Sequence, residues 1–237
     1  MPGPRRRSVL ISRLAGQPVG SPQSVILAEL RSCILDGEVP PGSPIPVDGV
    51  AAAFGVSRIP VREALMTLIG EGLVDHRQNG GYRVAMMTAG EFGEIYVVRE
   101  ALETAALRAS VALARPEDDQ ESYAAHEALD AAISAHDARG YHRASRRFHL
   151  ALIRPCRMQR LLHMLDRAWN QTEPLQPMSH LDSADRELLH HDHAGMLAAF
   201  AGRDTDALIE VFHTHHHRLQ SFIETLPQHT GLFADPA

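Results

Sequence analysis

Residues 47–82 read VDGVAAAFGVSRIPVREALMTLIGEGLVDHRQNGGY, and this stretch decides the fold of the first third of the chain. It begins with a short apolar helix that stops at Gly55, a residue type suited to the left-handed backbone of a turn. Ser57 can then cap a second helix, which tolerates Pro60 in its first turn and carries two arginines near its start. Two short helices joined by such a turn predict a helix-turn-helix, whose second helix enters the major groove of DNA.

A β-hairpin is expected directly after the second helix. Leu73–Val74 and Tyr82–Val84 are strand-like, and residues 78–81 (QNGG) between them form a hairpin-turn sequence. Helix, turn, helix and hairpin together predict a winged helix-turn-helix domain over residues 22–86. Residues 1–21 mix proline, glycine and arginine without a period, so we expect a flexible arm before this domain.

The segments GVSRIPVREAL, EGLV and NGGYRV, in that order, resemble the DNA-binding domain of the GntR family of bacterial transcription regulators. The resemblance covers about Val25 to Val84 and implies binding to double-stranded operator DNA. A regulator of this kind binds as a homodimer to a pseudo-palindromic operator. The resemblance and the expected motif geometry assign DNA contacts to Arg31, Ser57, Arg58, Pro60, Arg62, Asn79, Gly80 and Gly81.

The charge of the chain is unevenly distributed. The 237 residues carry a formal charge of −6, but residues 1–86 hold 9 arginines against 7 acidic residues, whereas residues 87–237 hold 14 against 22. This asymmetry favours a DNA-contacting N-terminal domain attached to an acidic C-terminal one. The 2 cysteines lie far apart in the sequence, which favours a reducing compartment, and we find neither a secretory signal nor an apolar run long enough to span a membrane. We therefore expect a soluble cytoplasmic protein without a membrane partner.

The rest of the chain shows only helical periodicity. Residues 88–91 (TAGE) form a capping-box sequence that opens a helix, and Arg115 and Pro116 stop it near Ala114. Further helices are expected over about Pro116–Ala138, Tyr141–Ile153, Met158–Glu173, Ser183–Phe200 and Asp204–Leu226. Helices joined by short loops imply an antiparallel all-α bundle over residues 88–227, followed by a disordered tail at 228–237. The predicted fold class is therefore mainly α, with a small β-wing.

The chain contains 15 histidines, and three of them fall on apolar helix faces. His149, His193 and His215 each recur at helical spacing with apolar residues, so three helices direct one histidine each toward a shared interior. A single histidine on such a face is more often a satisfied core residue. Buried imidazoles need polar partners, however, and one divalent ion could serve all three. The remaining histidines are expected to be solvated or to lie behind the ligands, among them His142, His213, His216 and His217.

Four segments of this region resemble the FCD ligand-binding domain of the FadR subfamily over about residues 90–222: YVVREALETAALRAS, RRFHLAL, HDHAGMLAAFAGRD and HTHHHRL. The resemblance implies a small carboxylate effector, and it makes His149, His193 and His215 the ligands of a divalent metal, with zinc or nickel expected. Metal-binding members carry an aspartate one turn before the first histidine, where this chain has Ser145. A hydroxyl in place of an anionic ligand predicts weaker metal binding that depends more on an incoming carboxylate.

Two roles are open for Arg99, which lies one helical turn before Glu103. A surface ion pair between them would contribute only about 0.2–0.5 kcal/mol. The family resemblance instead places the arginine near the ligand cavity, so Arg99 and Ser145 are our effector-binding candidates.

The sequence therefore predicts a DNA-binding transcription regulator, expected to be a repressor, whose operator binding is controlled by a small organic acid with the help of a metal. One alternative is a regulator for which the metal itself is the signal. Another is a tri-histidine zinc hydrolase, because a zinc ion with an open position can activate water. We find no general base at a recognisable spacing, and a hydrolase would leave the DNA-binding motif unexplained, so we do not expect an enzyme.

Overall fold

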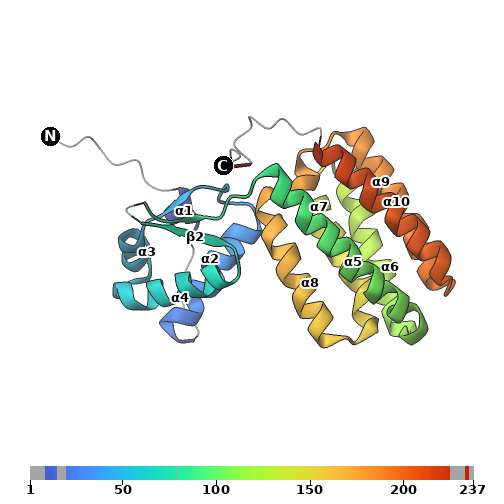
Figure 1. The fold of residues 1–237 in the computed structure, drawn as a ribbon, viewed down its shortest axis with the longest axis horizontal. Helices are drawn as coiled ribbons and strands as arrows, with labels where there is room; N and C mark the ends of the chain where they lie inside the picture. Colours follow the sequence, from blue (N-terminus) through green and yellow to red (C-terminus); the bar gives the residue numbers. More distant parts are fainter. Residues whose placement is uncertain (1–8, 15–19, 79, 225–232, 235–237) are drawn as a thin grey trace. The chain divides into compact units, whose positions relative to one another are not determined.

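The computed structural model describes residues 9–14, 20–78, 80–224 and 233–234 (Figure 1). The contacts divide the chain into two units. One contains the residues up to Thr88 together with 170–175, and the other begins at Ala89. Within the described ranges, no helix combines the length and the hydropathy needed to cross a membrane.

The first unit has the winged helix-turn-helix fold that the sequence predicts. Its elements are α1 (Val9–Arg13), α2 (Pro22–Leu35), β1 (Pro44–Ile45), α3 (Val47–Phe54), α4 (Arg58–Gly70), β2 (Val74–Arg77) and β3 (Gly81–Val84). The turn between α3 and α4 forms because Gly55 takes the left-handed conformation, with φ at +65°. Ser57 occupies the N-cap position of α4 as expected, but its side chain makes no capping hydrogen bond.

A three-stranded antiparallel sheet completes this unit, in the order β1-β3-β2. Val74 pairs with Val84 and His76 with Tyr82, so β2 and β3 form the predicted hairpin. The sequence did not predict β1, because two residues are too few to show a strand period. Ile45 of this strand is nevertheless buried in the core of the unit.

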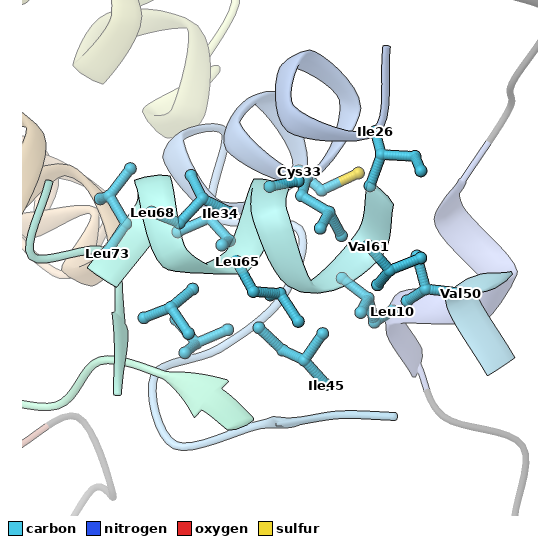
Figure 2. Close-up of a cluster of buried hydrophobic side chains, with 14 of the residues drawn as sticks. Leu10, Ile26, Cys33, Ile34, Ile45, Val50, Val61, Leu65, Leu68 and Leu73 are labelled. Atoms are coloured by element: carbon cyan, nitrogen blue, oxygen red, sulfur yellow. The ribbon is translucent and has the colours of Figure 1, made fainter. Parts of the chain in front are cut away.

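Buried aliphatic side chains from α2, α4 and the sheet form this core (Figure 2). Leu10 of α1 is fully buried in the same cluster, so the prediction of a flexible arm over residues 1–21 is wrong for Val9–Arg13. Burial in an apolar cluster gives a leucine side chain a lower free energy than exposure to water does. The rest of the arm at residues 1–8 and 15–19 lies outside the described residues.

The predicted disordered tail at residues 228–237 is described only at Phe233 and Ala234. Phe233 is buried, and the backbone N–H of Ala234 donates a hydrogen bond to the Met87 carbonyl at 2.9 Å. The prediction of disorder is therefore wrong for these two residues.

The second unit is the predicted all-α bundle. Its helices are α5 (Ala89–Leu113), α6 (Pro116–Ser134), α7 (Ala138–Ile153), α8 (Gln159–Thr172), α9 (Ser183–Ala201) and α10 (Thr205–Glu224), although the contacts assign the last residues of α8, from Asn170, to the first unit. Two short 3₁₀ turns of this unit, Arg154–Cys156 and Pro177–Ser179, were not predicted from the sequence, nor was a third at Glu173–Leu175, which the contacts assign to the first unit. Helix α6 packs on α7, α9 packs on α10, and α5 contacts both α7 and α10. The large side chains at the centre of the bundle come from α5, α7, α8, α9 and α10 and include Phe92, Phe148, Trp169, Phe200 and Phe212.

Candidate functional site

The start of α4 presents two arginines at the surface of the first unit. Arg58 and Arg62 are both exposed, and Pro60 lies between them in the first turn of the helix. The guanidinium of Arg58 forms an ion pair with the carboxylate of Asp48 on α3. Arg62 has no ion-pair partner among the described residues, so its donors are available for a base edge or a phosphate.

The other predicted DNA-contacting residues lie at the hairpin and on α2. Gly80 and Gly81 are exposed at the hairpin, and Gly81 has a φ of +70°, whereas Asn79 lies outside the described residues. Arg31 is half-buried, and its guanidinium donates hydrogen bonds of 2.9 and 2.6 Å to the carboxylate of Glu71. This bidentate pair joins α2 to the end of α4 and gives Arg31 a structural role, so its contact with DNA stays a prediction.

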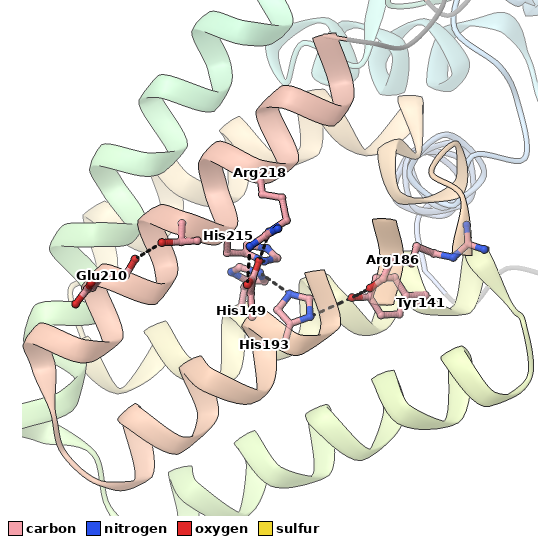
Figure 3. Close-up of polar contacts among 9 residues, drawn as sticks. Tyr141, His149, Arg186, His193, Glu210, His215 and Arg218 are labelled. Carbon is pink, nitrogen blue, oxygen red and sulfur yellow. Dashed lines mark hydrogen bonds and ion pairs between the residues drawn. The ribbon is translucent and has the colours of Figure 1, made fainter. Parts of the chain in front are cut away.

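The three predicted metal ligands meet in the interior of the second unit. His149 of α7, His193 of α9 and His215 of α10 are all buried, and one ring nitrogen of each lies within 4.8 Å of the others (Figure 3). The ring centroids are 4.5–5.2 Å apart. The Nε2 atoms of His149 and His193 face each other at 3.2 Å.

An oxygen atom faces the Nδ1 atom of each histidine. Glu103 Oε2 lies 3.2 Å from His149 Nδ1, and Tyr141 Oη lies 3.2 Å from His193 Nδ1. At the third ring, Asp192 Oδ2 lies 3.7 Å from His215 Nδ1, a longer contact. Oxygen atoms behind histidine rings are the usual way in which proteins orient histidines toward a metal. The Nε2 atoms of His149 and His193 face each other.

Burial determines the protonation of these groups. It lowers the pKa of His193 well below its usual value, and it lowers the pKa of His215 to about 4. Both rings are therefore neutral near pH 7, which is the form that binds metals. Burial alone would raise the pKa of Glu103, but Arg99 and His149 outweigh it and bring this pKa down to about 2. Burial likewise raises the pKa of Tyr141, which stays a neutral phenol.

Arg99 and Glu103 form a buried ion pair, which excludes the surface pair, one of the two roles that the sequence left open. Arg99 Nε donates to Glu103 Oε1 at 3.2 Å, and Trp169 Nε1 donates to the same oxygen at 3.0 Å. The guanidinium lies 4.6 Å from the ring centroids of both Tyr96 and Trp169, which permits cation–π contact with each. Glu103 therefore touches Arg99 with one oxygen and faces His149 with the other.

The charged side chains around the three rings balance one another. Glu103 pairs with Arg99, and Asp192 accepts a hydrogen bond of 2.9 Å from Arg218. Ser145, one turn before His149, is buried and adds no charge. A divalent ion would therefore bring two positive charges that the surrounding side chains leave without compensation.

The geometry fits a first-row divalent ion. Zinc–nitrogen bonds of about 2.0–2.1 Å in a tetrahedral site separate two nitrogen ligands by roughly 3.3 Å. The 3.2 Å between His149 Nε2 and His193 Nε2 agrees with this spacing. Three nitrogen ligands also leave a position open for water or a carboxylate oxygen. Imidazole nitrogens suit zinc and nickel equally as ligands.

Two of the other histidines, which were expected to be solvated or to lie behind the three cluster histidines, are buried. His216 is only 2% exposed and packs beside Tyr96 and Phe212, and His142 is also buried. His217 is exposed as expected, with its Nε2 3.4 Å from a carboxylate oxygen of Glu100. His216 follows His215 directly in the sequence, and it is buried because α5 packs on α10.

Sequence reasoning also missed the residues behind the three histidines. Tyr141, Asp192 and Arg218 carry no spacing signal that links them to the histidines they face. The burial of Glu103 did have a signal, since Phe92, Tyr96, Arg99, Glu103 and Leu107 follow one another at helical spacing and are all buried.

Both domains match known protein families. Residues 22–84 match bacterial regulatory proteins of the gntR family, and residues 94–219 match the FCD domain. The uncharacterized HTH-type transcriptional regulator BphR of Paraburkholderia xenovorans is 27% identical over 207 residues, covering 84% of each chain. The gluconate operon transcriptional repressor of Bacillus licheniformis is 26% identical over 213 residues, covering 85% of this chain and 84% of the relative.

A solved structure has the same fold. The crystal structure of a GntR transcriptional regulator from a Rhodococcus species superimposes with a TM-score of 0.78 at 25% identity, covering 88% of this chain and all of that one. The family consists of DNA-binding transcription regulators, so the comparisons do not support the hydrolase alternative. The chain belongs to the GntR family of bacterial transcriptional regulators and carries an FCD domain behind its winged helix-turn-helix.

Proposed function

We propose that this transcriptional regulator is a repressor that leaves its operator when a small organic acid binds together with a divalent metal in the FCD domain. The observation that carries the proposal is the tri-histidine cluster within a charge-balanced interior. Relatives named as repressors, such as that of the gluconate operon in Bacillus licheniformis, support the direction of control.

The DNA-binding part of the proposal rests on α4. Its exposed Arg62 and the hairpin glycines Gly80 and Gly81 would contact DNA, with Ser57, Arg58 and Pro60 forming the entry of the helix into the major groove. A homodimer would present two such units to a pseudo-palindromic operator. Arg62 would read a base edge, because guanidinium groups pair bidentately with guanine.

The ligand-binding part of the proposal rests on charge. His149, His193 and His215 would hold the ion as three neutral ligands. With serine at position 145, the ion keeps its full charge, and an effector carboxylate would supply the missing negative charge. Arg99 would bind the effector as well, because a guanidinium can donate two parallel hydrogen bonds to a carboxylate. Metal and acid are then expected to raise each other's affinity by the same factor.

A metal-sensing regulator is the second candidate. It is favoured by the convergence of the three rings, whose ring nitrogens lie within 4.8 Å of one another without an organic ligand. In that case zinc or nickel alone would release the operator.

Operator release distinguishes the two candidates. Full-length protein, treated with a chelator, is bound to a fluorescent DNA fragment from the region upstream of its own gene, and the anisotropy is followed. Zinc or nickel chloride is added alone, and then with acetate, lactate, gluconate or citrate as probes. The repressor proposal predicts release only when an acid is present and a lower effective acid concentration with the metal. Release by the metal alone would support the metal sensor, and release by an acid with equal efficiency in a chelator would refute the role of the metal.

A further inference from the structure

One exposed face of α5 is largely apolar. Val97 and Val98 are 59% and 49% exposed, and Ala101 and Ala105 follow them at helical spacing on the same side. The exposed side of α6, by contrast, carries charged residues such as Glu127. A helix face that stays in contact with water is normally polar, so the apolar face of α5 points to a partner that covers it.

Opposite charges lie at the two ends of this face. Glu94 comes seven residues before Ala101 and Arg108 seven residues after it, so each lies about two helical turns, or roughly 10 Å, from Ala101 on the same side of the helix. Both side chains are exposed, and neither has an ion-pair partner among the described residues. The face is therefore acidic at one end, basic at the other and apolar between them.

An antiparallel copy of the same helix matches this distribution of charge. A two-fold axis through Ala101 would place Glu94 of each copy opposite Arg108 of the other, because the two residues are equally far from the axis. A parallel copy would place like charges opposite each other. The small side chains of Ala101 and Ala105 allow two helices to approach closely, and a crossing angle of about 20° would keep the charged ends near each other.

We propose that two copies of this chain associate through the exposed face of α5, with Ala101 at the two-fold axis and Glu94 of one copy next to Arg108 of the other. The inference rests on the homodimer of the proposed function and names a surface that forms it. Arg99 and Glu103 lie on the buried side of the same helix, so the pairing leaves the surroundings of the histidine cluster intact.

Charge reversal tests this surface, because an exposed ion pair contributes little by itself, whereas like charges that face each other repel. Full-length Glu94→Arg and Arg108→Glu should each dimerise about 10–100-fold more weakly in sedimentation equilibrium, since each variant brings two pairs of like charges together. Glu127→Arg, a charge reversal at an exposed position on α6, is the matched control and should dimerise like wild type. Circular dichroism checks that all variants are folded.

A mixture of the two single variants tests the antiparallel arrangement itself. In a mixed dimer, two positive charges of one copy lie opposite two negative charges of the other. Glu94→Arg and Arg108→Glu should therefore associate with each other about as tightly as wild type does with itself. A double variant that carries both changes should also dimerise by itself. If neither the mixture nor the double variant recovers the association, the proposed pairing is wrong.

Cysteine cross-linking gives a readout that does not depend on charge. In Ala101→Cys, the two new thiols would face each other at the axis, where closely packed helices allow the geometry of a disulfide. Mild oxidation should therefore join two copies of Ala101→Cys. Ala124→Cys, at an exposed position on α6, should stay monomeric on a non-reducing gel. The native Cys33 and Cys156 are buried and should not compete.

The outcomes separate this inference from the proposed function. A wild-type protein that stays monomeric at every concentration would refute the homodimer and this surface together. A wild-type dimer that neither charge reversal weakens, or that oxidation does not cross-link in Ala101→Cys, would overturn this surface alone, and the homodimer would then form through another part of the chain.

Discussion

Replacing Glu103 by glutamine should strongly destabilise the second unit. Glu103 is fully buried, and its Oε1 accepts hydrogen bonds from Arg99 at 3.2 Å and Trp169 at 3.0 Å. Glutamine keeps the shape of the side chain but leaves a buried guanidinium without its counter-charge, which costs about 3–5 kcal/mol. The pKa of Glu103 leads to a similar figure, because a fall from 4.5 to about 2 corresponds to about 3 kcal/mol of folding free energy.

The pH dependence of this contribution follows from the sign of the shift. The pKa of Glu103 is lower in the folded chain than in the unfolded one, so the stabilisation is present above pH 4.5 and is lost as the pH falls toward about 2. The difference in unfolding free energy between wild type and Glu103→Gln should therefore be largest near neutral pH and should shrink over this acidic range.

Urea unfolding followed by tryptophan fluorescence measures this effect. The chain has 1 tryptophan, Trp169, which donates to Glu103 and so reports on this part of the bundle. Glu94→Gln, an exposed position on the same helix, is the control and should unfold like wild type. Combining Glu103→Gln with Arg99→Met should recover part of the loss, since it removes both charges. A change below about 1 kcal/mol in the single variant, or no recovery in the double variant, would refute the buried ion pair.

Three further predictions concern binding. Arg62→Ala should weaken operator binding by about 1–3 kcal/mol in a gel shift at matched salt without changing the fold, and wild-type affinity would mean that Arg62 makes no base contact. Arg99→Lys keeps the positive charge beside Glu103 but lacks the planar fork, so it should bind operator normally and need more acid for release in the anisotropy assay. Loss of operator binding and of thermal stability together would instead leave Arg99 with only a structural role. Ser145→Asp should tighten zinc binding and reduce the coupling between zinc and acid in calorimetric titrations, whereas unchanged zinc affinity would show that residue 145 does not reach the ion.

The DNA-binding domain was predictable from local sequence because its geometry depends on local features. A glycine that ends α3 and a short apolar period in α4 fix the helix-turn-helix within a few residues. Prediction from the sequence failed where a segment takes its structure from contacts with residues distant in the chain. β1 exists only because Pro44 and Ile45 pair with β3, and α1 is located by the burial of Leu10 in a core formed by other elements.

The histidine cluster was predictable for a different reason. Helical spacing places His149, His193 and His215 on buried faces, and buried imidazoles require a shared partner. Helical spacing also places Arg99 and Glu103 on the buried face of α5, but a charged pair one turn apart usually lies at the surface, so the sequence left the burial of this pair open. The partner of His193 could not be predicted, since 52 residues separate it from Tyr141 and only the packing of α7 against α9 brings the two side chains together.

Calorimetric titration of zinc chloride into chelator-treated, full-length protein, with and without the acid that releases the operator, tests most directly whether metal and effector act together. The charge balance around His149, His193 and His215 predicts that the acid raises the zinc affinity, and that zinc raises the acid affinity by the same factor. Zinc affinity that does not change with the acid, or an absence of zinc binding, would contradict a metal-assisted effector site.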